Sequence, residues 1–479
     1  MASSFIGDVS GAFASMRDYA VSAFNPTLRL GVTGLARAGK TVFITALVHH
    51  LTRGGRLPVF RAMADGRLRR AILAPQPDDA VARFPYEAHV DQLLAEDAKW
   101  PESTRRLSEL RLVIDYESVG GWFRGPSTLT LDLVDYPGEW LLDLTLLNKD
   151  FRDWSRETIA SAREPARREA AAPWLAGLAS IDPGAAAGEQ QVAAMADAFK
   201  AFLAAARRSP EAVATLPPGR FLMPGDMEGS PALTFAPLDG LTPAPFAAGS
   251  LAAMMERRYE AYKTHVVRPF FRDHFARLDR QVVLVDMLSA LDAGPAAVRD
   301  LETVLEQVLA AFRTGRNSFI DAIFSPRIER VLFAATKADH LHHTQHDRLE
   351  AILSLMVERA ARRAESTGAK VDVAAIAALR ATREADVSER GRALPTIIGA
   401  PEAGERIGGE TFDGRTSAAV FTGELPADPA AVLRPDGRPA PELEFVRFRP
   451  PVLKGGLAAP WPHIRLDRAF EFLFGDRLE

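Results

Sequence analysis

The chain has 479 residues, long enough for two or three domains, and 47% of them are apolar while 25% are charged. This balance excludes a largely disordered chain. The net charge of −4 gives no electrostatic footprint for nucleic acid, so no nucleic-acid partner is expected. Cysteine is absent, which excludes disulfides, thiolate metal sites and cysteine nucleophiles and fits a reducing compartment.

No segment of the sequence is long and apolar enough to span a bilayer. The nearest, 241–255, is too short and contains Pro243 and Pro245. The N-terminal region lacks the basic stretch and the unbroken apolar core of a secretory signal. Neither membrane insertion nor secretion is therefore expected.

The first predicted elements are a strand at 27–33 and a helix at 42–51, joined by a glycine loop. This loop, 34–41, reads G-L-A-R-A-G-K-T and matches the phosphate-binding pattern G-x-x-x-x-G-K-[ST]. Its backbone N–H groups and the helix N-terminus would surround phosphate oxygens, Lys40 would reach the β- and γ-phosphates, and the Thr41 hydroxyl would bind Mg²⁺. The alternative is an ordinary glycine turn before a helix. The predicted nucleotide-binding residues here are Gly34, Ala36, Arg37, Ala38, Gly39, Lys40, Thr41 and Val42.

The loop that precedes the next strand carries a candidate sensor of the γ-phosphate. A nucleotide switch needs a threonine there, and Thr104 stands in the segment W-P-E-S-T-R just before the apolar run 110–116. We predict that Thr104 contacts Mg²⁺ and the γ-phosphate. Ser103 is an alternative, and a solvated loop threonine is the other.

The apolar runs 110–116 and 128–135 are joined by Gly120-Gly121 and Gly125-Pro126, which predicts an antiparallel hairpin at one edge of a sheet. The second run ends in L-D-L-V-D-Y-P-G. An apolar strand that ends in D-x-x-G is a second phosphate motif, in which Asp135 would hold Mg²⁺ through a water and the Gly138 N–H would approach the γ-phosphate. The alternative is a plain turn at the end of a strand.

A first insertion follows at 150–270. Its alanine- and arginine-rich sequence predicts helices over 151–180 and 189–208. Pro217-Pro218-Gly219 ends this part, and an irregular stretch rich in proline and glycine continues to about 250.

After a strand-like run at 281–288, the run 330–336 leads into Thr336-Lys337-Ala338-Asp339. This pattern predicts a guanine-reading loop, because the Asp339 carboxylate would accept both the N1–H and the 2-amino group of guanine, whereas adenine offers neither donor. The Lys337 stem would lie over the base. The alternative is a helix cap. After the last run, 372–379, the backbone of Ala381 and Thr382 would contact the guanine carbonyl.

A second insertion, 384–460, is punctuated by Gly, Pro and Thr, and Asp413-Gly414 between two short extended runs predicts a hairpin. An amphipathic helix over Ile464 to Phe474 is expected to return to the main sheet. Alternating strands and helices predict an α/β fold in which helices cover both faces of a mostly parallel sheet.

Two groups of polar residues near these loops carry weaker signals. His340, His342, His343 and His346 follow the guanine-reading pattern; such clusters can bind metal, but a hydrated loop or helix start is favoured here. Asp286 and Asp292 flank the end of the fourth run and are interpreted as turn or rim residues.

The ordered motifs resemble those of Ras-like GTPases, and the sequence around them resembles the YcjX-like family of stress-induced bacterial GTP-binding proteins. The stretches that carry this resemblance are GLARAGKTVFITALVHHL, LVDYPGEWLLDL, RPFFRDHFARLDRQVVLVD, FAATKADHL and PHIRLDRAFEFLFGDRL. The resemblance implies a Ras-like P-loop sheet with an inserted helical domain, and binding of GTP or GDP with Mg²⁺. It also implies a cytoplasmic role in stress response and a functional association with a membrane protein. The segments expected are a GTPase domain in two parts, 25–149 and 271–383, a helical insertion at 150–270, a β-rich insertion at 384–460 and a C-terminal helix at 461–479.

One residue departs from the Ras-like pattern. Small GTPases place a glutamine directly after D-x-x-G to orient the attacking water, and this chain has Glu139 there. A carboxylate at that position would face the anionic γ-phosphate, so slow hydrolysis or help from another group is expected. Glu139 as the favourable start of a helix is the preferred interpretation. No arginine finger can be chosen; Arg37, Arg105 and Arg106 and the helices in 151–210 are candidates.

The leading hypothesis is a guanine-nucleotide switch with slow Mg²⁺-dependent GTP hydrolysis. A second is a non-catalytic module that holds GTP or GDP. A third is an ATPase or small-molecule kinase, which requires the match at Thr336 to Asp339 to be accidental.

Overall fold

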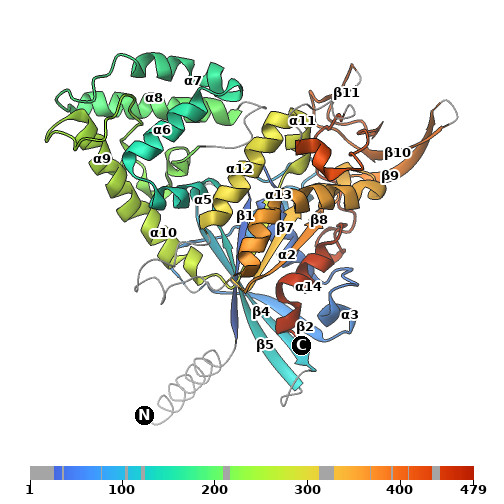
Figure 1. Ribbon diagram of the computed structural model, residues 1–479. Coiled ribbons are helices and arrows are strands. Elements are labelled where there is room, and N and C mark those ends of the chain that lie inside the picture. Colours follow the sequence, from blue (N-terminus) through green and yellow to red (C-terminus); the bar gives the residue numbers. More distant parts are fainter. Residues whose placement is uncertain are drawn as a thin grey trace, which may run out of the picture.

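The computed structural model describes the chain except for residues 1–25, 35–36, 77, 103–105, 120–124, 209–215, 312–327, 367, 390–391, 408 and 434–442. The centre of the molecule is a twisted sheet with helices on both sides, the helical insertion at one side and the C-terminal insertion at the other (Figure 1). Within the described residues no helix is both long and apolar enough to cross a lipid bilayer.

The main sheet has the order β2-β4-β5-β1-β6-β7-β8, with β3 beside β4. Strands β5, β1, β6, β7 and β8 are parallel, whereas β4 runs antiparallel to β5 and to β2. The α/β fold, all six predicted strands and the antiparallel pairing of 110–116 with 128–135 are confirmed, but this pair does not form the edge of the sheet because β2 and β3 lie beyond β4. The strands are β1 (Thr27–Gly34), β2 (Leu68–Ala74), β3 (Ala82–Arg83), β4 (Ser108–Ser118), β5 (Gly125–Asp135), β6 (Arg280–Val285), β7 (Arg330–Ala335) and β8 (Lys370–Ala375).

Alternate residues of the central strands face two separate cores. Val282 and Leu284 of β6 pack with α2 (Lys40–Arg53) and α14 (Leu466–Phe474), while Val283 and Val285 face the opposite side. That side is covered by α12 (Pro295–Ala311), α13 (His346–Ser366) and the helical insertion. Each face of the sheet therefore has its own apolar layer, as an α/β sheet requires.

The predicted return of the C-terminal helix to the sheet is confirmed, since α14 packs against β6 and β7. It begins at Leu466 rather than at Ile464 because Arg465 adopts a left-handed conformation with φ 51°. Ile464 instead pairs in an antiparallel bridge with Ala377, each N–H donating to the other residue's carbonyl at 2.9 and 3.1 Å. The end of the chain is thereby joined to the loop after β8.

The helical insertion is built from α6 (Phe151–Ala162), α7 (Pro165–Leu178), α8 (Glu189–Arg208) and α9 (Leu251–Tyr262), which continues through Lys263–Val267 into α10 (Arg268–Asp273). The helices predicted over 151–180 and 189–208 are present, with a break where Pro165 starts α7. Aromatic rings fill its core: Trp154 stacks on Tyr259 and Trp174 on Phe202, each with ring centroids 5.0 Å apart.

The C-terminal insertion contains a sheet of β9 (Arg383–Glu389), β10 (Arg392–Gly399) and β13 (Ala418–Val420), and a short pair of β11 (Arg406–Ile407) and β12 (Glu410–Thr411). The hairpin predicted at Asp413-Gly414 is wrong, because β12 pairs with β11 and β13 pairs with β10. The Asp413 carboxylate instead accepts hydrogen bonds from the N–H groups of Arg415 and Thr416 at 2.7 and 2.8 Å. The residues make a turn, but it does not join two paired strands.

Candidate nucleotide-binding site

One cavity of about 240 Å³ is lined by residues from both predicted nucleotide loops. Lys40 and Asp339, which are 299 positions apart (339 − 40), both line it. The lining residues are Arg37 to Phe43, Trp100 to Glu102, Thr336, Lys337, Asp339, His340, Ile376 to Leu379, Glu402, Arg447 and Phe448. The fold therefore brings the phosphate loop and the base-reading loop to a single site.

The phosphate loop lies between the end of β1 and the start of α2. Lys40 is the first residue of α2, and its buried ammonium group donates a hydrogen bond to the carbonyl of Gly34 at 3.0 Å. Gly34 needs its small size, since a Cβ there would lie 2.6 Å from the carbonyl oxygen of Leu284 in the neighbouring strand. Gly39 and Arg37 have positive φ angles of 82° and 65°, which turn the backbone around the cavity. Ala36 lies outside the described residues.

The first loop contacts the predicted Mg²⁺ ligand Thr41. The Thr41 hydroxyl donates to the carbonyl of Glu102 at 3.4 Å, so the segment Trp100 to Glu102 lies directly over the start of α2. Thr104, Ser103 and Arg105 follow immediately but lie outside the described residues. The role predicted for Thr104 therefore stays a prediction.

The second phosphate motif lies at the end of β5, beside the phosphate loop. Asp135 is the last residue of β5, is buried, and pairs in register with Val32 of β1, two positions before Gly34. Asp135, Gly138 and Glu139 do not line the cavity in this structure. The motif thus has the expected neighbour in the sheet, but the residues after the strand turn away from the nucleotide site.

The chain after Asp135 continues into α5 (Glu139–Asp143), a short helix that packs against the helical insertion. Glu139 is its first residue, as the preferred interpretation predicted, and its carboxylate pairs with the Arg207 guanidinium of α8 at 2.6 Å. The Trp140 indole N–H donates to the carbonyl of Met223 at 3.0 Å, and the Arg220 guanidinium lies 3.3 Å from its ring centroid. Trp140 packs rather than shielding the cavity.

Asp143 at the end of α5 is buried against the same insertion. Its carboxylate accepts hydrogen bonds from Tyr262 Oη at 2.6 Å and from the N–H groups of Gly219 and Arg220 at 2.6 and 3.3 Å. Burial raises the pKa of Asp143 to about 6, although these donors and the Arg220 charge oppose the rise. No sequence motif indicates this anchor, because its partners lie more than 70 residues away.

The base-reading loop is held by hydrogen bonds to the segment that follows β8. The Asp339 carboxylate accepts a hydrogen bond from the Ala381 N–H at 2.7 Å, and the Thr382 hydroxyl donates to the Asp339 carbonyl. The Ala338 N–H donates to the carbonyl of Ile376 at 3.0 Å. Ala381 and Thr382 therefore support Asp339 but do not line the cavity, and Ile376 to Leu379 line it instead. The contact predicted between the guanine carbonyl and the backbone of Ala381 and Thr382 stays a prediction.

Lys337 pairs with a residue that the sequence placed only at the rim. Its ammonium group contacts the Asp286 carboxylate, which also accepts hydrogen bonds from Ser289 at the start of α11 (Met287–Ala293). Burial opposes ionisation of Asp286, but the charge of Lys337 and the Ser289 donors outweigh it and hold its pKa below the usual range. Asp292 accepts a hydrogen bond from the Phe445 N–H at 3.3 Å, so it joins α11 to the C-terminal insertion.

The C-terminal insertion supplies cavity residues that sequence reasoning missed, namely Glu402, Arg447 and Phe448. The Trp100 indole N–H donates to the Phe448 carbonyl at 2.6 Å, which joins the first loop to this insertion. These positions lack a local motif and are hundreds of residues from the phosphate loop. Only the tertiary structure reveals them.

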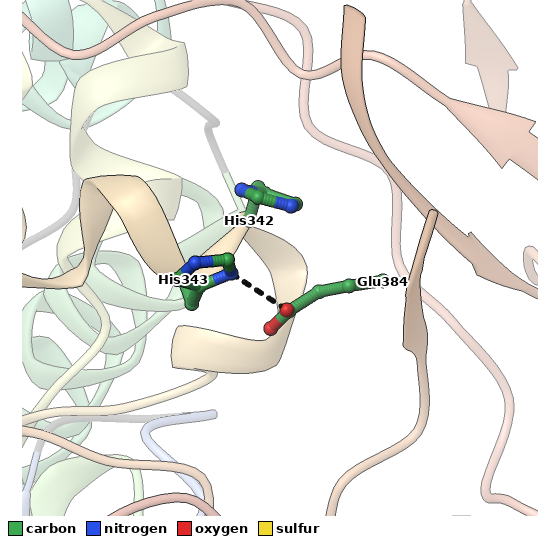
Figure 2. Close-up of side chains that lie close together, drawn as sticks. All are labelled: His342, His343 and Glu384. Carbon is green, nitrogen blue, oxygen red and sulfur yellow. Dashed lines mark hydrogen bonds and ion pairs between the residues drawn. The ribbon is translucent and has the colours of Figure 1, made fainter. Parts of the chain in front are cut away.

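The histidine cluster is mostly buried, so the expected hydrated loop is wrong, whereas the expected helix start is present because α13 begins at His346. His340, His342 and His346 are buried, whereas the side chain of His343 is 62% exposed. Figure 2 shows His343 Nδ1 directed at the Glu384 carboxylate, 2.7 Å away, with His342 beside them. Their ligand atoms lie within 4.8 Å of one another, but Arg380 also pairs with Glu384 at 3.1 Å. We interpret the cluster as a hydrogen-bonded brace between the base-reading loop and β9.

Comparison with known proteins places the chain in a family. The model of the YcjX-like family, DUF463, matches residues 28–478. The Ras-like GTPase YcjX of Escherichia coli strain K12 is 37% identical over 463 residues, which cover 94% of this chain and 96% of that protein. The Ras-like GTPase YcjX of Shewanella oneidensis strain MR-1 is 34% identical over 481 residues, covering 94% and 95%. The matches span both insertions and every motif of the site, and this chain therefore belongs to the YcjX-like family.

Proposed function

We propose that this protein binds GTP and GDP with Mg²⁺ and hydrolyses GTP slowly as a nucleotide-controlled switch. The observation that carries the proposal is the shared cavity of Lys40 and Asp339. An ammonium group at one part of a cavity and a carboxylate at another suit a ligand with phosphates at one end and a guanine base at the other. The names of the two relatives, both Ras-like GTPases, support the same choice.

At the base end, Asp339 would accept the two donors of guanine, and the loop Ile376 to Leu379 would face its carbonyl. Asp339 is already oriented by the Ala381 N–H, and Lys337 is oriented by Asp286. A base without the two donors would leave a desolvated carboxylate unpaired, and this penalty is the physical basis for rejecting ATP.

At the phosphate end, Lys40 would bind the β- and γ-phosphates. The Thr41 hydroxyl and the Asp135 carboxylate are oxygen groups of the kind that Mg²⁺ prefers, and the Val32 to Asp135 register puts them on adjoining elements. The ion would neutralise phosphate charge. Thr104 and Gly138 are the residues we propose to respond to the γ-phosphate. Because Glu139 points to Arg207 instead of the cavity, slow intrinsic hydrolysis is expected.

A non-catalytic GTP- or GDP-binding module is the second candidate, and the pairing of Glu139 with Arg207 is the observation that favours it. Phosphate release over many turnovers, abolished in Lys40→Ala, would support the enzyme. Tight GTP binding without release would support the module. A cytoplasmic location, a role in stress response and a membrane-protein partner stay predictions from the family.

Calorimetry with GTP, GDP and ATP in the presence of Mg²⁺ tests the proposal. We expect GTP and GDP to bind and ATP to bind at least about 100-fold more weakly. In Asp339→Asn, an amide replaces the carboxylate, so preference should move toward xanthine nucleotides. Asp372→Asn, on β8 and outside the cavity, is the matched control and should keep guanine preference. Equal affinity for ATP and GTP in the wild-type protein would overturn the guanine assignment.

A further inference from the structure

Two oppositely charged side chains meet where α5 contacts the helical insertion. Glu139 Oε1 lies 2.6 Å from Arg207 Nη2, and the two side chains are 3% and 23% exposed. Glu139 directly follows the second phosphate motif, whereas Arg207 is near the end of α8. The ion pair therefore links the residue nearest the predicted γ-phosphate position to the insertion.

The backbone of α5 is fixed independently of this pair. The Gly219 segment packs so closely on α5 that a Cβ at Gly219 would lie 2.1 Å from the Glu139 carbonyl oxygen. The Asp143 and Trp140 hydrogen bonds hold the other turns of the helix to the insertion. Because these contacts fix the backbone, Arg207 determines only the direction in which the Glu139 side chain points.

The charge of Glu139 would affect the affinity for GTP more than the affinity for GDP. A Glu139 carboxylate that pointed toward the γ-phosphate contact proposed for Gly138 would repel that phosphate, which GTP has and GDP lacks. Like charges within a few ångströms in a partly desolvated site repel strongly. In the structure Glu139 does not line the cavity, and Arg207 neutralises it.

We propose that Arg207 is a positioning residue that sets the affinity for the third phosphate by holding Glu139 out of the nucleotide cavity. The insertion thereby determines whether the site accepts GTP as well as GDP. This inference rests on the proposed function, because it assumes that the γ-phosphate lies beside Gly138. Movement of α8 relative to α5 would change the balance between the two nucleotides.

The test measures the affinity of the full-length protein for GDP and for a non-hydrolysable GTP analogue, both with Mg²⁺. In Arg207→Ala we expect the analogue to bind about tenfold or more weakly relative to GDP, with GDP affinity unchanged. Glu139→Gln in the same background should restore the ratio, because it removes the repelling charge. A purely structural role for Arg207 would weaken both nucleotides and would not be rescued this way.

Arg208→Ala, at the next residue of α8, is the matched control and should leave the ratio at its wild-type value. Arg207→Gln keeps a long polar side chain without the charge and provides the same readout if Arg207→Ala folds poorly. An unchanged ratio in a folded Arg207 variant that still binds GDP overturns the inference, as does failure of Glu139→Gln to restore it. If the wild-type protein binds neither nucleotide, the proposed function itself fails, which is a separate outcome.

Discussion

The two ends of the nucleotide cavity are held in different ways. At the base end, Asp339 is supported by Ala381, and Phe448 of the C-terminal insertion packs edge-on against His340, the residue after Asp339. At the phosphate end, the segment after Asp135 turns away and α5 is anchored to the helical insertion. Under the proposed function, the base end would be preformed for recognition, whereas the phosphate end would depend on where the helical insertion holds α5. Base recognition and the response to the γ-phosphate would thus be supported by different insertions.

The largest expected effect is on the anchor of α5. Trp140→Ala removes a buried ring that contacts Arg220 and Phe270, and we expect the free energy of unfolding to fall by about 3–5 kcal/mol. Urea unfolding followed by circular dichroism measures this change. Val452→Ala, at a side chain that is 86% exposed, should stay within about 0.5 kcal/mol of the wild-type value. A loss below 1 kcal/mol for Trp140→Ala would mean that α5 is not anchored as described.

The phosphate loop can be tested next. Lys40→Ala removes the charge that we assign to the phosphates, and GDP affinity should fall roughly 1,000-fold, or about 4 kcal/mol. Calorimetric titration gives the value. Lys370→Ala removes an exposed lysine at the start of β8 and should bind GDP normally. Retention of affinity in Lys40→Ala would remove the phosphates from this end of the cavity.

The raised pKa of Asp143 predicts that the stability of the α5 anchor depends on pH. Its folded pKa of about 6 lies above the ordinary value of 3.8, so the unfolded chain releases this proton at lower pH than the folded protein. The stabilising contribution of the protonated group is therefore complete below about pH 4 and is lost as pH rises to about 6, by at most about 3 kcal/mol. The difference in unfolding free energy between the wild-type protein and Asp143→Asn should show this slope between pH 4 and 6 and become flat above it. A flat difference across that range would contradict the raised pKa.

The smallest effect concerns the contact between the first loop and the C-terminal insertion. Trp100→Phe removes the hydrogen bond to the Phe448 carbonyl and should lower the free energy of unfolding by about 1 kcal/mol. A free energy of unfolding equal to that of the wild-type protein would show that the Trp100 bond does not contribute to stability.

The parts of the fold that the sequence predicted are those with a local signal. The runs at 27–33 and 330–336 are apolar enough to indicate strands, and the phosphate loop has a fixed spacing. Strand β2 was not predicted, because Arg69 and Arg70 interrupt the alternation of apolar and polar residues in this edge strand. The turn residues Asp413-Gly414 indicate a change of direction but not which strands pair.

The site was predictable to the same extent. Lys40, Asp135 and Asp339 stand in ordered motifs, and the structure puts them at or after the ends of β1, β5 and β7 in one sheet. The pairing of Glu139 with Arg207 and the contribution of Phe448 are long-range contacts between segments without motifs. No local spacing encodes such contacts, since they depend on how the two insertions pack.

The backbone bridge between Ala377 and Ile464 also bears on the order in which the chain folds during its synthesis. Ala377, in the loop that lines the base end, hydrogen-bonds to Ile464, which follows the whole C-terminal insertion. A ribosome must therefore synthesise the chain through Ile464 before this rim can close, and contacts between such distant segments form late. Nascent or prematurely terminated chains would carry the phosphate loop without a finished base pocket.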